Sequence, residues 1–194
     1  MVDAAKSLLD GGAEILQYRH KEFWSREVVA EAERVQDLCR SRGVLFVVND
    51  RADYARMLGA GLHLGQDDLP PRAARELLGA DSIIGYSTHN EVQLMAAASE
   101  PVDYVALGPM FGTVSKRNPD PVVGVAHLRE WRGIVAQPLV AIGGITRSNA
   151  KEVWDVGADM VAVIGDLYPE VCDVGSMRKR MEEWQRLAGS YNPK

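Results

Sequence analysis

Short apolar runs alternate with segments of helical periodicity along the whole chain. The clearest helical segment begins after Ser25, a favourable N-cap residue, and carries apolar residues at helical spacing until Gly43. The run from Val44 to Val48 follows at once and is continuously apolar, which is typical of a strand buried on both faces. This alternation predicts repeated strand–helix units and therefore a parallel sheet covered by helices.

The same pattern predicts seven strands and eight helices. The strands are expected at about residues 14–18, 44–48, 61–64, 82–86, 103–107, 138–142 and 159–164. The helices are expected at about residues 4–9, 26–42, 51–58, 70–78, 90–98, 125–132, 147–156 and 170–187. Polar or glycine-rich residues follow most of the strands, and they can meet only if the strands run parallel around one centre. The predicted fold class is therefore α/β, a TIM-type (β/α) barrel.

One strand of the expected barrel is not legible in the sequence. A closed barrel of this type has eight strands, whereas this chain opens in the helix expected at 4–9. We therefore expect residues 1–194 to form a single (β/α)-barrel domain that is truncated at its N-terminus and lacks its first strand. Such a barrel would leave the strands at 14–18 and 159–164 with unpaired edges, which favour aggregation.

Composition and charge narrow the class of protein. The chain has 194 residues, 46% of them hydrophobic, which suffices for one substantial core. A net charge of −5 and the lack of any Lys or Arg run argue against nucleic acid as the partner. Cys39 and Cys172 fit neither a disulfide framework nor a metal-binding spacing, which favours a reducing compartment. With no apolar stretch near the roughly 20 residues of a membrane span and no signal-peptide core, we predict a cytoplasmic protein without a membrane partner.

Acidic residues follow two neighbouring predicted strands. Asn49 and Asp50 come after one strand, and Asp67 and Asp68 come shortly after the next. Carboxylate oxygens from separate loops suit Mg²⁺, which takes one or two protein carboxylates together with substrate phosphates and water. The alternative is that these aspartates cap the helices that follow.

Basic residues near the first predicted strand favour the metal hypothesis. Gln17, Arg19 and Lys21 alternate, so in a continuous strand all three side chains would point to the same side. If that side is the barrel mouth, a lysine and an arginine are costly there unless they meet an anion such as a diphosphate. A solvated edge strand with exposed charges is the alternative.

The segment 112–124 is too long and too polar for a simple strand-to-helix connection. It carries Thr113, Ser115 and Lys116, and this hydroxyl-hydroxyl-lysine cluster at a strand end favours phosphate binding over an ordinary surface loop. Backbone amides at Gly143-Gly144 and at Gly165 follow the last two predicted strands. Loops at these strand ends are the usual phosphate site of a TIM-type barrel.

Three other residues have ambiguous patterns. His63 lies inside a predicted strand between two leucines, which favours a structural role in the core. His89 could contact a ligand or begin the next helix, and Asp166 could cap a helix or take part in catalysis. No Ser-His-Asp or Cys-His arrangement is legible, so no protein nucleophile is predicted.

A family resemblance rests on motifs that occur in order from about residue 11 to about residue 168. They are Gln17-x-Arg19-x-Lys21, Asn49-Asp50, Gly61-x-His63-x-Gly65-Gln66-x-Asp68, Gly85-x-Ser87-x-His89, Gly108-Pro109-x-Phe111-x-Thr113-x-Ser115-Lys116 and Ala141-Ile142-Gly143-Gly144-Ile145. In this combination the chain resembles thiamine phosphate synthase. That family condenses hydroxymethylpyrimidine diphosphate with thiazole phosphate to give thiamine phosphate and diphosphate, so the resemblance implies a diphosphate-releasing transferase.

The resemblance also implies roles for individual residues. It implies that Asp50 and Asp68 hold Mg²⁺ on the diphosphate. It implies catalytic roles for Lys116, Ser87, Arg19 and Lys21. The substrate-binding residues that it implies are Gln17, Arg19, Lys21, Asn49, Lys116 and Ser87 toward the pyrimidine diphosphate, and Thr113, Ser115 and the amides of Gly144, Ile164 and Gly165 toward the thiazole phosphate.

The chain departs from the family pattern at two positions, and two other functions stay open. Threonine is common in the family at the Ser115 position and serine at the Gly165 position. A thiazole tautomerase of the same fold tends to lack the metal-binding acids and to carry histidine in place of Pro109, so Asp50, Asp68 and Pro109 favour the synthase. A catalytically impaired barrel that only binds thiamine-related phosphates is the non-enzymatic alternative. The expected partners are small-molecule substrates, and a homo-oligomer is possible.

Overall fold

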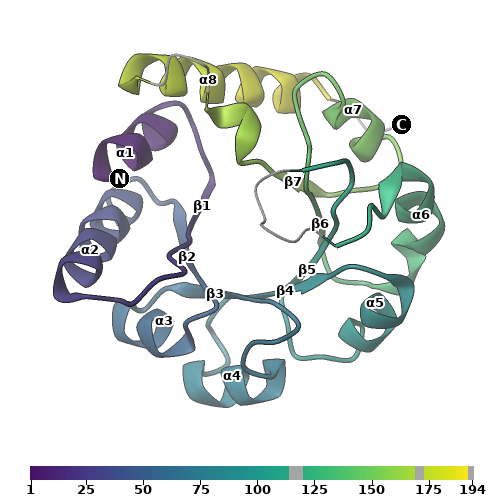
Figure 1. The fold of residues 1–194 in the computed structure, drawn as a ribbon, viewed down its shortest axis with the longest axis horizontal. Coiled ribbons are helices and arrows are strands. Elements are labelled where there is room, and N and C mark those ends of the chain that lie inside the picture. The colour runs from purple at the N-terminus through teal and green to yellow at the C-terminus, as the bar shows by residue number, and fades with distance from the viewer. Residues whose placement is uncertain (114–119, 169–172, 192–194) are drawn as a thin grey trace.

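In the part of the chain that the structure describes, seven parallel strands form one curled sheet, and the connecting helices form a layer outside it (Figure 1). The computed structural model describes residues 1–113, 120–168 and 173–191. The strands pair in chain order and are β1 (Ile15–Tyr18), β2 (Leu45–Asn49), β3 (Gly61–Leu64), β4 (Ile84–Thr88), β5 (Tyr104–Leu107), β6 (Leu139–Ile142) and β7 (Met160–Ala162). The helices are α1 (Val2–Asp10), α2 (Arg26–Arg40), α3 (Ala52–Leu58), α4 (Pro71–Leu78), α5 (Glu91–Ala97), α6 (Gly124–Trp131), α7 (Ala150–Trp154) and α8 (Val174–Ser190), with 3₁₀ turns η1 (Arg132–Ile134) and η2 (Gly165–Leu167).

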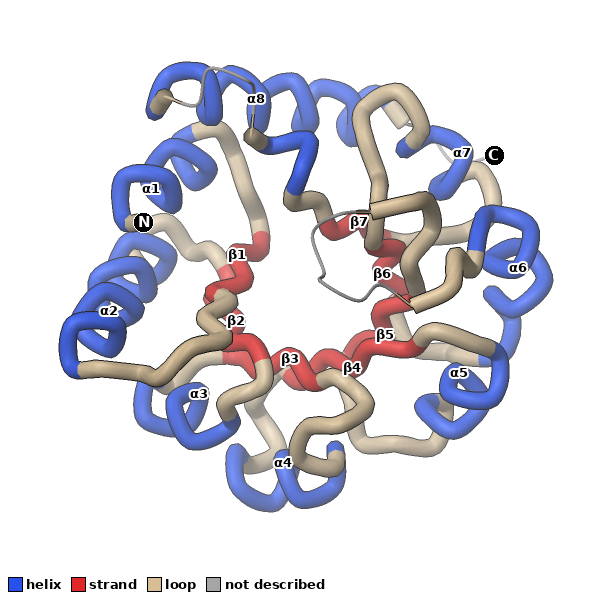
Figure 2. Tube along the Cα trace, viewed as in Figure 1, coloured by secondary structure: helices blue, strands red, loops and turns tan. Residues whose placement is uncertain are grey.

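The strands make an inner ring that is open between β1 and β7 (Figure 2). In the described part of the chain β1 pairs only with β2, and β7 pairs only with β6. This confirms the TIM-like α/β fold with seven strands. Helices α1 and α8 lie side by side across the opening, where a Cβ on Gly11 would lie 2.6 Å from Cβ of Met181. Glycine therefore allows the two helices to close the outer ring where the inner ring is open.

Helix α2 shows how local sequence produces these elements. The Ser25 hydroxyl accepts a hydrogen bond from the backbone N–H of Val28 at 3.4 Å, as the N-cap prediction requires. Ala32, Val35 and Cys39 recur at helical spacing and are fully buried against the sheet. Burial of each of these apolar side chains stabilises the fold at about 25 cal/mol per Å² removed from water.

The first strand is shorter than the sequence predicts. Strand β1 ends at Tyr18, so Gln17 lies in the strand while Arg19 and Lys21 lie in the loop that follows. The prediction that these three residues alternate along one strand is wrong. The ladder between β1 and β2 stops at the pair Tyr18–Val48, and β2 itself ends just beyond, where Asp50 takes a left-handed φ of 65°.

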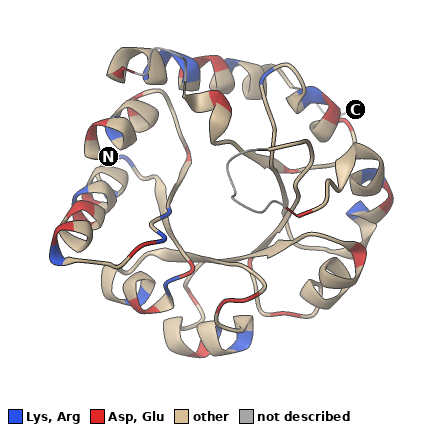
Figure 3. Ribbon diagram, in the orientation of Figure 1, with Lys and Arg blue, Asp and Glu red and all other residues tan. Residues whose placement is uncertain are grey.

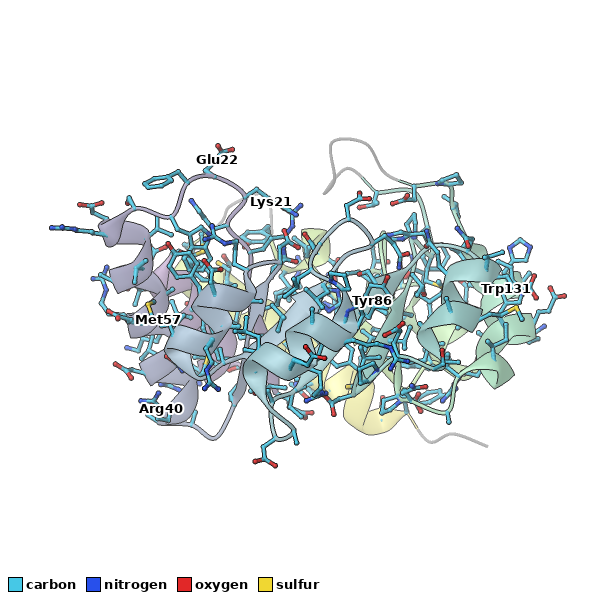
Figure 4. All side chains as sticks on the ribbon, turned by 90° about the horizontal axis from the view of Figure 1, so that it is seen from below. Lys21, Glu22, Arg40, Met57, Tyr86 and Trp131 are labelled. Carbon is cyan, nitrogen blue, oxygen red and sulfur yellow. The ribbon has the colours of Figure 1, made fainter. Side chains whose placement is uncertain are left out.

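The two faces of the ring differ in what they carry (Figure 4). Lys21 and Glu22 lie on the face at the carboxyl ends of the strands, whereas Arg40, at the end of α2, lies on the opposite face. Figure 3 shows Lys, Arg, Asp and Glu interspersed around the outer helices. Among the described residues, no helix is both long enough and apolar enough to cross a membrane.

Candidate active site

Asp50 and Asp68 come together at the carboxyl ends of β2 and β3. The Asp50 backbone N–H donates to the carbonyl of His63 at 2.8 Å, which fixes the turn after β2 against β3. Asp68 accepts the backbone N–H of Gly65 at 2.7 Å and so closes the turn after β3. Neither is a helix cap, because Arg51 and Pro70 occupy the N-cap positions of α3 and α4. The capping alternative is therefore wrong for these two aspartates.

The electrostatics of this pair favour a cation. Burial raises the pKa of the Asp68 carboxyl, the Gly65 N–H opposes that rise, and the neighbouring Asp50 carboxylate adds to it. Lys21 forms an ion pair with Asp50 and supplies one positive charge. No cluster of three or more acidic, histidine or cysteine side chains suited to a metal occurs among the described residues. Two carboxylates fit Mg²⁺, which completes its shell with substrate phosphates and water.

Asn49 adds a hydrogen-bond donor beside the acidic pair. Its side chain is buried at the end of β2, and its amide nitrogen has no hydrogen-bond partner among the described residues. A buried donor without an acceptor costs about 1–3 kcal/mol, so its retention favours an external acceptor. An anion in the mouth of the ring would be such an acceptor.

Lys21 stands where a cation is needed, so its removal should make the protein more dependent on Mg²⁺. In Lys21→Met the Asp50 and Asp68 carboxylates lose their only nearby ammonium group among the described residues, and like charges repel. We expect a lower melting temperature without Mg²⁺ and a larger Mg²⁺-induced rise than in the wild type. Differential scanning fluorimetry across a Mg²⁺ titration measures both. Lys151→Met is the control, because Lys151 forms an exposed ion pair with Asp155 on α7. An equal Mg²⁺ response in both variants would contradict the assignment.

Ser87 lies further around the ring, on β4. Its hydroxyl lies 2.8 Å from Nε2 of His63, and its carbonyl accepts the side-chain amide of Gln66 at 2.6 Å. Burial lowers the pKa of His63 to about 4, so this histidine is neutral at physiological pH. Its core position agrees with the structural role predicted from the sequence. Gln17, at the far side on β1, is exposed.

Two backbone turns on the opposite side of the ring offer free amides. Gly143 and Gly144 have φ values of 94° and 66°, a conformation that glycine adopts without strain. Asn149 fixes this turn by donating its amide to the carbonyl of Gly144 at 3.1 Å. None of the hydrogen bonds among the described residues uses the backbone N–H of Gly144, Ile164 or Gly165 as a donor. These amides are available to a phosphate.

The predicted cluster of hydroxyls and lysine is only partly visible. Thr113 is the last described residue of its segment, and Ser115 and Lys116 lie outside the described residues. The chain before Thr113 is held against the glycine turn, because Met110 donates to the carbonyl of Ile142 at 2.9 Å and Phe111 to that of Gly143 at 3.0 Å. These two hydrogen bonds place Thr113 close to the turn at Gly143-Gly144.

The ambiguous residues have clear surroundings in the structure. His89 is not a helix cap, since Asn90 caps α5, and its Nδ1 lies 2.7 Å from the carbonyl of Gly108. Asp166 is not a helix cap, because Ile164 occupies the N-cap position of η2. Its carboxylate pairs with Arg147 at 2.9 Å and accepts the indole N–H of Trp184 at 2.9 Å, which fastens η2 to α8.

The sequence did not point to Tyr104. Its hydroxyl lies 2.9 Å from Nδ1 of His63 and extends the contact between His63 and Ser87. The signal that could have found it is Gly85, which lies between His63 and Tyr104 in the strand register.

The fold and the site define a (β/α)-barrel enzyme with an acidic pair and free amides at the carboxyl ends of its strands. Comparison with known proteins gives the family. A family model described as thiamine monophosphate synthase matches residues 1–167. The chain belongs to this family.

Individual proteins that are similar to this chain carry descriptions that agree with this family. The thiamine-phosphate synthase of Koribacter versatilis is 50% identical over 164 residues, covering 84% of this chain and 77% of its own. That of Chlorobium phaeovibrioides is 46% identical over 164 residues, covering 84% of this chain and 78% of its own. Among solved structures, a thiamine phosphate pyrophosphorylase from Pyrococcus furiosus superposes with a TM-score of 0.84 at 33% identity, covering 97% of this chain and 89% of its own.

Proposed function

We propose that this protein condenses hydroxymethylpyrimidine diphosphate with thiazole phosphate, giving thiamine phosphate and diphosphate. The observation that carries the proposal is the acidic pair Asp50 and Asp68, with Lys21 on one carboxylate and the partnerless amide of Asn49 beside it. This combination suits a diphosphate together with a divalent cation. Membership of the thiamine monophosphate synthase family supports the choice of substrates.

The diphosphate is assigned to the acidic side of the mouth. Asp50 and Asp68 would hold Mg²⁺, which neutralises negative charge on the departing diphosphate. Asn49 donates its free amide, while Arg19 and Lys21 supply positive charge from the loop after β1. Lys116 is assigned to the same group by the family pattern, although it lies outside the described residues.

The remaining groups are assigned to the two rings. Gln17 and Ser87 lie toward the pyrimidine. The thiazole phosphate is assigned to the backbone amides of Gly144, Ile164 and Gly165 and to the hydroxyls of Thr113 and Ser115. The free N–H groups of the two turns support this assignment. At position 165 only the amide can contribute, since glycine has no hydroxyl.

The chemistry needs no protein nucleophile. The bond between the pyrimidine methylene carbon and the diphosphate oxygen breaks, and both electrons leave with the diphosphate. The aminopyrimidine stabilises the resulting cation, and the lone pair of the thiazole nitrogen then forms the new carbon–nitrogen bond. The protein acts by holding the two rings together and by stabilising the departing charge, which is often the largest catalytic contribution.

Diphosphate release tests this proposal. Purified protein with Mg²⁺ and both substrates should release one diphosphate for each thiamine phosphate formed, and omission of either Mg²⁺ or thiazole phosphate should abolish product. Isomerisation of a thiazole phosphate without diphosphate release would favour the tautomerase alternative. Binding of the phosphates without turnover would favour the non-enzymatic alternative. The same preparation, analysed by light scattering, tests the prediction of a homo-oligomer.

A further inference from the structure

Three side chains from neighbouring strands form a hydrogen-bonded chain inside the ring. The Tyr104 hydroxyl on β5 lies 2.9 Å from Nδ1 of His63 on β3. Nε2 of the same imidazole lies 2.8 Å from the Ser87 hydroxyl on β4. The His63 and Tyr104 rings are stacked, with centroids 5.6 Å apart and an angle of 26° between their planes. The series of hydrogen bonds therefore runs from Tyr104 through His63 to the Ser87 hydroxyl, the one hydroxyl assigned to the pyrimidine.

The strand register builds this arrangement. His63 pairs with Gly85, and Gly85 pairs with Tyr104, so the three residues lie at one level of the sheet. Tyr104 crosses β4 to reach His63 because Gly85 has no side chain; a Cβ there would lie 2.0 Å from the Tyr104 ring. Ser87 follows Gly85 by two residues and so lies on the same side of β4, one level nearer the mouth.

Hydrogen-bond satisfaction fixes the direction of the chain. His63 is 6% exposed, and its two ring nitrogens lie against the uncharged hydroxyls of Tyr104 and Ser87. With no carboxylate on either nitrogen among the described residues, only one of them carries a proton. Among the described residues, the Tyr104 hydroxyl has no hydrogen-bond partner other than Nδ1 of His63, and a sequestered O–H needs an acceptor. Tyr104 therefore donates to Nδ1, and the imidazole proton lies on Nε2.

The consequence falls on Ser87. Nε2–H of His63 donates to the Ser87 oxygen, so the hydroxyl proton of Ser87 is not used on this side. The Ser87 backbone is itself held by Gln66 at its carbonyl. Ser87 is thus prepared to donate a hydrogen bond into the mouth of the ring.

We propose that Tyr104 and His63 are positioning residues that orient Ser87 as a hydrogen-bond donor and so select a heteroaromatic ring with an unprotonated nitrogen. This inference rests on the proposed function, in which Ser87 faces the pyrimidine. A site built to hydrogen-bond one ring atom rejects an analogue that lacks it much more strongly than it rejects a change in size.

Tyr104→Phe tests the proposal, because it keeps the stacked ring and removes only the hydroxyl. We expect KM for the pyrimidine diphosphate to rise about five- to tenfold, with KM for the thiazole phosphate unchanged. Deaza analogues, with each ring nitrogen in turn replaced by C–H, give the sharper measurement. The wild type should reject one of them strongly, and Tyr104→Phe should reject it less. Tyr18→Phe is the matched control, since it removes the single hydrogen bond of a buried tyrosine to Glu31 on α2.

Nitrogen-15 NMR of the imidazole gives a readout that needs no substrate. Wild-type His63 should show a protonated Nε2, and Tyr104→Phe should show a mixture of tautomers. A wild-type spectrum with the proton on Nδ1 would overturn the proposal, as would an equal rise of both KM values in Tyr104→Phe. If the wild type releases no diphosphate, the proposed function fails, while the NMR measurement still decides the orientation of Ser87.

Discussion

Asp50→Asn and Asp68→Asn should each lower turnover by on the order of a hundredfold to a thousandfold, with the fold retained. Asparagine keeps the shape of the side chain but removes the negative charge that a cation requires. In Asp68→Asn the amide oxygen can still accept the N–H of Gly65, so the turn after β3 should remain. Steady-state diphosphate release at saturating substrates measures the loss, and circular dichroism checks the fold.

Asp67→Asn provides the matched control. Asp67 lies in the same turn as Asp68 but is exposed, so its variant should keep wild-type activity. If Asp67→Asn loses as much activity as Asp68→Asn, the effect comes from general loss of negative charge and the assignment to the pair is wrong.

The stability of Asp68→Asn should not fall together with its activity. The folded-state pKa of Asp68 is raised above its ordinary value of 3.8, so folding favours the protonated carboxyl. The stability that this preference contributes is full below pH 3.8 and is lost as pH rises through the folded-state pKa. At pH 7 without Mg²⁺, Asp68→Asn should therefore melt no lower than the wild type. A less active but equally stable variant is the pattern expected of a carboxylate retained for function.

The apolar pattern was sufficient to predict most of the architecture. The buried run at β2 and the capped helix α2 depend on local periodicity, which the sequence displays directly. Strand β1 shows the limit. Its alternating side chains continue to Lys21, yet the strand ends at Tyr18 because its partner β2 turns away at Asp50. The end of an edge strand depends on its neighbour, which periodicity within one strand cannot reveal.

The acidic pair and the glycine turns were predictable because each lies within a short loop after the end of a strand. The role of Tyr104 was not, since it depends on the register of three strands and on the missing side chain of Gly85. Asp166 is similar: its partners Arg147 and Trp184 lie 19 and 18 residues away, on the loop before α7 and on α8. Such contacts appear only when the strands are assembled.

Gly144→Ala should destabilise the protein by more than the backbone strain of placing alanine at a positive φ, because the added Cβ would also clash with a neighbouring loop. Gly144 has a φ of 66°, and an added Cβ would lie 2.5 Å from the carbonyl oxygen of Gly112. Gly43 has a φ of 67°, with nothing within 4 Å of an added Cβ, so Gly43→Ala measures the strain by itself. We expect the free energy of unfolding to fall by about 1 kcal/mol in Gly43→Ala and by about 3 kcal/mol in Gly144→Ala.

The same pair of variants tests whether the turn at Gly143-Gly144 binds the thiazole phosphate. In Gly144→Ala the backbone at Gly112 must move away, which separates the chain before Thr113 from the free amides of the turn. KM for the thiazole phosphate should therefore rise in this variant and stay unchanged in Gly43→Ala, whose turn precedes β2 on the opposite face of the ring. Denaturant unfolding and substrate titration measure the two effects. Equal losses of stability in the two variants would show that the close approach of Gly112 to Gly144 does not hold this turn in place. Equal KM values would show that the thiazole phosphate binds elsewhere.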